Sequence, residues 1–95
     1  MRDLLRVDKI RFTPASRELR RTGMMGWAMC RLDGRWELDC LAVRRTTDGR
    51  YKLSFPSRTD GNGVEHAYFR PLDNATRDEI ECAVIAELRR RGFIP

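Results

Sequence analysis

The clearest structural signals lie in residues 51–91, YKLSFPSRTDGNGVEHAYFRPLDNATRDEIECAVIAELRRR. Apolar and polar side chains alternate from Tyr51 to Phe55, which is the period-2 pattern of a half-buried strand. Pro56 ends that strand. The turn formers of residues 57–63 then lead into a second strand over residues 64–71. We therefore predict that the two strands pair as a hairpin.

A helix is predicted to follow this hairpin. Thr76 and Glu79 have the spacing of a capping box, in which each side chain satisfies a free backbone N–H at the helix start. Apolar residues at helical spacing come next: Ile80, Val84 and Leu88. We predict a helix over residues 76–91 that stops at Gly92 and leaves a short tail to fold back.

The most apolar stretches of the chain are Met24–Leu32 and Trp36–Val43, joined by Asp33-Gly34. This dipeptide between apolar runs is a strong signal for a two-residue β-turn, so these stretches are predicted to be the central strands. Residues 1–13 alternate only weakly before Pro14 and are predicted to form an edge strand.

Together these elements predict an α+β fold, with a single antiparallel sheet of about five strands and one C-terminal helix packed on it. We expect one domain over residues 1–95: a first strand (1–13), a basic loop (14–23), four strands (24–71) and the helix (76–91). The basic loop contains Arg17, Arg20 and Arg21, which either follow a phosphate backbone or form a solvated connection.

The helix is too short to cover the whole sheet. About 15 residues span roughly 22 Å, which leaves apolar strand surface exposed. We therefore predict a homodimer that joins the central strands or exchanges a segment. The predicted interface consists of Met24, Ala28, Cys30, Leu32, Leu41 and Val43.

Several short motifs resemble those of the stage V sporulation protein G (SpoVG) family. They are, in order, Phe55-Pro56-Ser57-Arg58-Thr59, Arg70-Pro71-Leu72, Asn74-Ala75-Thr76-Arg77 and Ala83-Val84. The resemblance covers about residues 5–90 and departs from the family at Arg58, where the family usually has two adjacent basic residues. It implies a SpoVG-like fold and a small dimeric bacterial regulator that binds DNA or RNA and is linked to sporulation and septation.

Charge is compatible with this role. The formal net charge is +5, and residues 1–31 alone carry eight basic and three acidic residues, a balance of +5. Phosphate contacts are predicted for arginines in turns or at a helix end: Arg44, Arg45, Arg58, Arg89, Arg90 and Arg91. A charged exposed turn is the better explanation of the first two, and the helix dipole alone is enough to explain the last three. The aromatic residues are expected mostly in the core.

Composition argues against other classes of function. No apolar run approaches the roughly 20 residues of a membrane helix, and we expect a cytoplasmic protein. Three cysteines and one histidine lack the spacing of a metal site, so the cysteines are expected to be small reduced hydrophobes. No nucleophile and base stand at a catalytic spacing, and no enzyme, cofactor or small-molecule substrate is predicted.

The alternative to nucleic-acid binding is a dimeric interaction module for a protein of the division or regulatory machinery.

Overall fold

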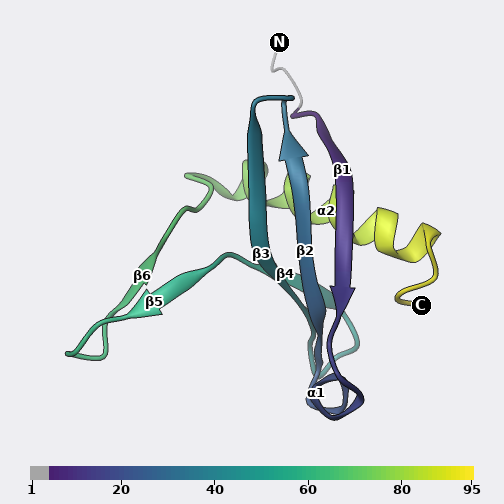
Figure 1. The fold of residues 1–95 in the computed structure, drawn as a ribbon, viewed down its shortest axis with the longest axis horizontal. Helices are drawn as coiled ribbons and strands as arrows, with labels where there is room; N and C mark the ends of the chain where they lie inside the picture. Colours follow the sequence, from purple (N-terminus) through teal and green to yellow (C-terminus); the bar gives the residue numbers. More distant parts are fainter. Residues whose placement is uncertain (1–4) are drawn as a thin grey trace.

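The computed structural model describes residues 5–95, so Met1–Leu4 of the predicted first strand lie outside the described residues. In chain order the elements are β1 (Val7–Pro14), α1 (Arg17–Arg21), β2 (Met24–Leu32), β3 (Trp36–Arg45), β4 (Tyr51–Ser54), β5 (Ser57–Thr59), β6 (Glu65–Ala67) and α2 (Asn74–Arg90). Strands β1 to β4 form one antiparallel sheet in chain order, and α2 crosses one of its faces (Figure 1). The predicted α+β class, with an antiparallel sheet and a C-terminal helix, is confirmed in this broad form.

The central hairpin is confirmed. Asp33 and Gly34 both adopt positive φ, 55° and 66°, as the two inner residues of a type I′ turn require. The Arg35 N–H closes the turn on the carbonyl of Leu32 at 3.0 Å. β2 and β3 then stay paired back to Met24 and Arg44.

The predicted hairpin of the Tyr51 strand with residues 64–71 is wrong, and so is the single five-stranded sheet. β4 pairs with β3, whereas β5 and β6 pair with each other in a separate two-stranded sheet. The outer edge of β4 is occupied by α2 instead. Leu53 N–H donates to Glu81 Oε2 at 3.0 Å, and Arg77 Nη2 donates to the Leu53 carbonyl at 3.0 Å. Helix side chains thus satisfy the backbone groups that a fifth strand would have used.

The start of α2 also differs from the prediction. Asp73, and not Thr76, is the N-cap: its side chain accepts the Thr76 N–H at 2.6 Å. Asp73 precedes Thr76 along the chain and caps at least as well, so the helix begins earlier. Glu79 is released from the capping role, and its Oε2 accepts the Leu5 N–H at 3.1 Å.

The helix ends as predicted, and the tail folds back. Gly92 has φ 81°, and its N–H donates to the Arg89 carbonyl at 3.0 Å. The Phe93 N–H reaches the Leu88 carbonyl at 3.0 Å, which completes a Schellman motif. The Phe93 ring lies 5.0 Å from the Phe12 ring between centroids, and Ile94 is buried.

The predicted basic loop of residues 14–23 contains a short helix, α1. Ser16 caps it by accepting the Leu19 N–H at 3.3 Å, a local signal that the arginine cluster obscured. The buried Ala15 ties the segment to β2 through its N–H and the Met25 carbonyl at 2.9 Å. Neither α1 nor α2, the helices within residues 5–95, is both long and apolar enough to cross a membrane.

Two β-bulges set which side chains face α2. β1 has an extra residue between Asp8 and Arg11, where Lys9 adopts φ 51°, and β3 has one between Leu38 and Leu41, where Cys40 adopts φ 58°. Each bulge shifts the alternation by one. In a regular strand, the apolar side chains before and after these positions would face opposite sides of the sheet. With the bulges, the apolar side chains of both halves of β1, and of both halves of β3, face α2.

The core lies between the sheet and α2, and it absorbs most of the predicted dimer interface. Ala28, Cys30, Leu41 and Val43 are at most 1% exposed beneath α2. Met24 is buried too, but it lies outside this core and pairs with Arg44 of β3. Leu32 is half-buried at the edge of this core. The premise that these side chains lie beyond the reach of one helix is wrong for the four core residues, because the bulge at Cys40 brings Leu41 and Val43 to the same face as Ala28 and Cys30. Of the six predicted residues, only Leu32 keeps exposed surface.

The contact of α2 with the edge of β4 gives a stability prediction. Glu81→Ala leaves the N–H of the fully buried Leu53 without its acceptor, which costs about 1–3 kcal/mol of the free energy of unfolding. Glu81→Gln keeps an amide oxygen at the same place and loses less. Urea denaturation of both variants measures the difference; an equal loss in the two would contradict the role of the carboxyl oxygen.

The bulge at Lys9 gives a second prediction. A side chain in the left-handed region costs roughly 1–2 kcal/mol, and glycine avoids this while losing about 0.5–1 kcal/mol in chain entropy. Lys9→Gly is therefore expected to be neutral or stabilising by up to about 1 kcal/mol. Arg11→Gly, two residues further along β1 and away from the bulge, is the control and destabilises. Thermal unfolding of the pair tests this, and a clear loss for Lys9→Gly would contradict it.

Candidate nucleic-acid interface

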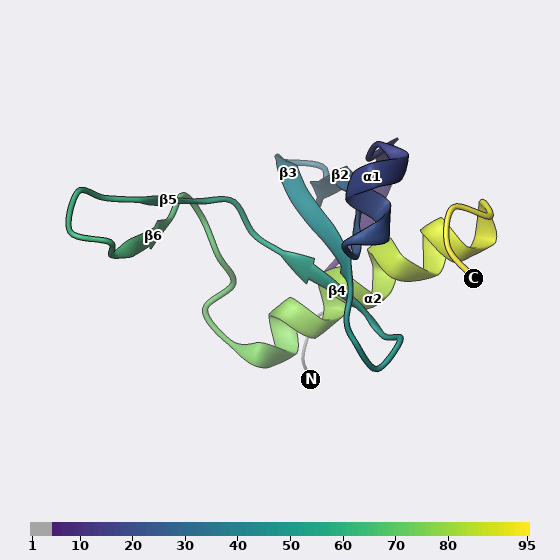
Figure 2. The ribbon, with the colours of Figure 1, turned by 90° about the horizontal axis from the view of Figure 1, so that it is seen from below.

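The face of the β1–β4 sheet opposite α2 is not crossed by any helix, as Figures 1 and 2 show; we call it the open face. Ala28 and Cys30 on β2 point into the core, so the residues that alternate with them point outward. These are Trp27, Met29 and Arg31, whose side chains are exposed or half-buried. α1 lies at one end of the sheet and leaves this surface accessible (Figure 1).

A hollow of about 570 Å³ at the β1 side of the sheet gathers positive charge, and we call it the basic hollow. Its lining combines four cations and one carboxylate with apolar Ile10 and Met29: Lys9, Arg11, Arg31, Arg91 and Glu37. Glu37 lies 3.9 Å from the Arg31 guanidinium and offsets only part of that charge. The lining of the hollow therefore has more positive than negative charge.

The bulge in β1 helps to build the hollow. An extra residue between Asp8 and Arg11 puts Lys9 at the sheet edge, while Arg11 pairs across to Met29 on β2. Asp8 pairs with Arg31, so it shares the row of one cation of the hollow, and its carboxylate lies 3.7 Å from Arg6. The hollow therefore draws on three strands and on the end of α2.

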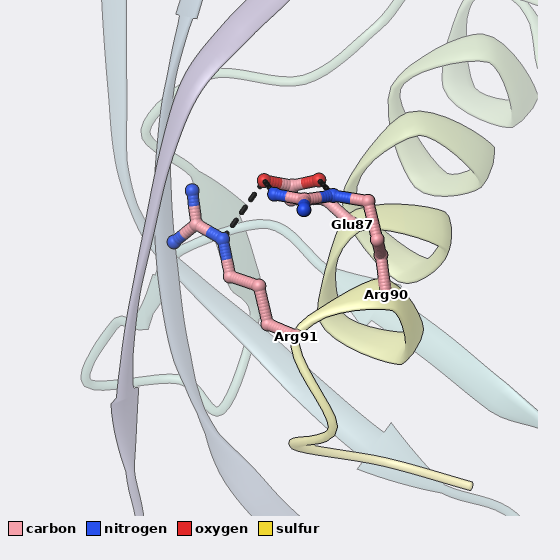
Figure 3. A network of polar contacts seen from close by, with 3 residues as sticks. All are labelled: Glu87, Arg90 and Arg91. Atoms are coloured by element: carbon pink, nitrogen blue, oxygen red, sulfur yellow. Dashed lines mark hydrogen bonds and ion pairs between the residues drawn. The ribbon is translucent and has the colours of Figure 1, made fainter.

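The helix-end arginines are only partly available to bind an anion. Figure 3 shows Arg90 and Arg91 converging on Glu87: Arg90 donates to both carboxylate oxygens at 2.6 and 2.8 Å, and Arg91 Nε donates at 2.8 Å. Hydrogen bonding from Arg90 and then Arg91 lowers the pKa of Glu87 to about 2, so this carboxylate stays ionised at neutral pH. Arg89 lies 5.9 Å from the Tyr51 ring and donates to the Pro95 carbonyl at 3.0 Å.

The six arginines predicted from the sequence are exposed but do not form one site. Arg91 alone lines the basic hollow. Arg44 lies on the open face opposite Lys52, whereas Arg45 Nη2 reaches the Arg20 carbonyl of α1 at 3.5 Å. Arg58 pairs with His66 on β5 and β6, away from the main sheet.

The sequence interpretation missed Lys9, Arg11 and Arg31. They are strand residues, and a search for cations in turns and at helix ends passes over them. Arg31 carried a usable signal, because it alternates with Ala28 and Cys30 on a strand predicted to be central. Lys9 carried none, because no glycine marks the bulge.

The aromatic residues are less buried than predicted. Trp27 is 40% exposed on the open face, and Trp36 and Tyr68 are each 67% exposed. The cysteines divide similarly: Cys30 is buried, and burial, with the nearby Asp8 charge, raises the pKa of its thiol to about 11. Cys40 and Cys82 are exposed, so the expectation of small core hydrophobes is right for Cys30 only.

β5 and β6 form an arm, residues 57–68, that extends away from the sheet (Figures 1 and 2). Its tip is organised by Asp60, whose carboxylate accepts the N–H groups of Asn62 and Val64 at 2.8 and 3.0 Å and contacts His66 at 2.7 Å. The hydrogen bond with His66, followed by the two backbone donors, lowers the pKa of Asp60. The tip is therefore an ordered turn, although nearly all of the arm is exposed.

No family model matches this chain, and no curated protein matches it. Within residues 5–95, no group of three His, Cys, Asp or Glu side chains is placed to hold a metal ion. Function must therefore be inferred from the geometry of the chain itself.

Proposed function

We propose that this chain is a cytoplasmic regulatory protein that binds DNA or RNA with low sequence specificity, as its resemblance to the SpoVG family implies. The observation that carries the proposal is the basic hollow, which four cations line with one carboxylate, although Arg91 among them also donates to Glu87. Arginine is well suited to phosphate because its planar guanidinium donates two parallel hydrogen bonds. Contacts of this kind position a nucleic acid without reading its sequence.

The shape of the surface favours an extended ligand. Arg11, Met29 and Arg31 of the hollow lie on the open face. On the same face, Arg44 and Lys52 form a further cationic pair two residues beyond Ala42 and Ser54. A small anion would engage only part of this surface. A phosphate backbone can contact the cations at both ends of the open face. No catalytic step is proposed.

A homodimer remains part of the proposal but, apart from Leu32, through different residues from those predicted. The arm has the exposed apolar side chains Val64 (51%) and Tyr68 (67%), and an isolated two-stranded hairpin is only marginally stable in water. At its root is an apolar groove of about 180 Å³ whose lining includes Leu32, Trp36, Leu38, Phe55 and Phe69. Each chain has both an arm and a groove. In a dimer with a two-fold axis, the arm of each copy therefore packs into the groove of the other, and both apolar surfaces are buried.

Neutralising the hollow tests nucleic-acid binding. Arg11→Gln/Arg31→Gln removes two of its cations, and log affinity against log salt should flatten by about 0.7 per lost contact on single strands or about 0.9 on duplex DNA. Fluorescence anisotropy with labelled oligonucleotides over a salt series measures this slope. Arg17→Gln/Arg21→Gln on α1 removes the same charge outside the hollow and serves as the matched control.

An equal effect of both double variants would mean that net charge alone, and not the hollow, attracts the ligand. An affinity that no variant and no salt concentration changes would instead favour the alternative function, a dimeric module that binds a regulatory or division protein. A mainly apolar interface need not depend on salt.

The dimer is tested separately by light scattering at micromolar concentration. We expect a dimer for the unmodified chain and a shift toward monomer for Val64→Ser/Tyr68→Ser, which makes the arm polar without touching the core. Leu19→Ser on α1, where Leu19 is 42% exposed, is the control and leaves the dimer intact. A monomeric unmodified chain would contradict the proposal.

A further inference from the structure

Trp27 lies in the middle of the open face with small neighbours on both sides. Its cross-strand partners are Thr13 on β1 and Ala42 on β3, and Ser54 follows on β4. None of these side chains is large enough to cover an indole, and Trp27 stays 40% exposed. Part of its indole is thus accessible at the surface of the sheet.

Cations flank Trp27 along the strands. Arg31 in the basic hollow is four residues away on β2, about 13 Å at the usual rise of a strand, with Met29 between them. In the other direction, Arg44 and Lys52 form the next cross-strand pair on this face, two residues beyond Ala42 and Ser54. Of the acidic residues on this face, Asp8 and Glu37 share the row of Arg31, and Asp39 lies in the β3 bulge opposite Met29.

We propose that the nucleic acid bound here is single-stranded, with its phosphates on the cations at either end of the open face and an unpaired base stacked on Trp27. This inference rests on the proposed function and specifies its ligand. Bases in a duplex stack on one another and are not free to lie on an indole. An unpaired base, by contrast, has a flat face that is free to stack on an aromatic ring. Phosphate contacts alone would not need an aromatic residue at the centre of the surface.

Affinity for paired and unpaired forms of one oligonucleotide tests the proposal. The probe is an oligothymidylate of about 12 nucleotides, within the usual range of site sizes, alone or annealed to its complement. The unmodified protein should bind the single strand more tightly. Trp27→Ala should weaken single-strand binding roughly 5- to 150-fold, the range that stacking of one base supplies, and leave duplex binding unchanged. Trp27→Phe keeps an aromatic ring and should retain most of the affinity.

Fluorescence adds a readout that does not depend on a variant of Trp27. The chain has two tryptophans, so Trp36→Phe leaves Trp27 as the only indole. Its emission should be quenched by the single strand and not by the duplex. Thermal unfolding of each variant confirms that it is folded before binding is compared.

Equal affinity for the two forms, with no effect of Trp27→Ala and no quenching, would overturn the single-strand inference and leave the proposed function in place. No binding of either form by the unmodified protein would overturn the proposed function and this inference with it. The salt-slope experiment on Arg11 and Arg31 distinguishes these cases, because it reports phosphate contacts whether or not a base stacks.

Discussion

One helix has to bury one face of four strands, and the rest of the structure depends on how it does so. The stripe of Ile80, Val84 and Leu88 on α2 packs into a single cluster with Leu41 and Leu53 of the sheet. A regular sheet would turn half of the apolar side chains of β1 and β3 away from this stripe. The bulges at Lys9 and Cys40 reverse the alternation where each strand passes the helix, so one layer of α2 is enough.

The same helix decides where the sheet ends. Arg77 and Glu81 bind the carbonyl and N–H of Leu53, which are the backbone groups that an added strand would need. β5 and β6 therefore cannot extend the sheet and leave it as an arm. A polar contact made for stability thereby creates the projecting element that the proposed dimer uses.

Much of the fold could be predicted because its signals are local. Asp33-Gly34 specifies its turn through two positive φ angles, and Gly92 specifies the end of α2 in the same way. The helix stripe was equally plain. Non-local choices were out of reach: which partner takes the edge of β4 depends on side chains that are 24 and 28 residues away in sequence. The bulges were hidden because lysine and cysteine occupy positions where glycine would have marked them.

Because the bulges could not be predicted, only one of the six predicted arginines, Arg91, lines the hollow. Cations on loops can be found from sequence, but a strand cation is assigned a face only when the alternation is known. The structure adds a separation of charge that composition does not show. Carboxylates of α2 are used in internal contacts: Glu79 with Leu5, Glu81 with Leu53 and Glu87 with two arginines.

Among the cations of residues 1–31, by contrast, Arg11 and Arg31 lie on the other side of the sheet, and Lys9 lies at its edge beside α2. Three carboxylates of α2 thus stabilise the fold, while cations of β1 and β2 line the basic hollow. A chain with a net charge of only +5 can in this way present cations toward both ends of the open face, with Trp27 between them. Long-range attraction of a polyanion depends on this local arrangement more than on the net charge of the whole chain, because screening at physiological ionic strength confines each charge to about 8 Å.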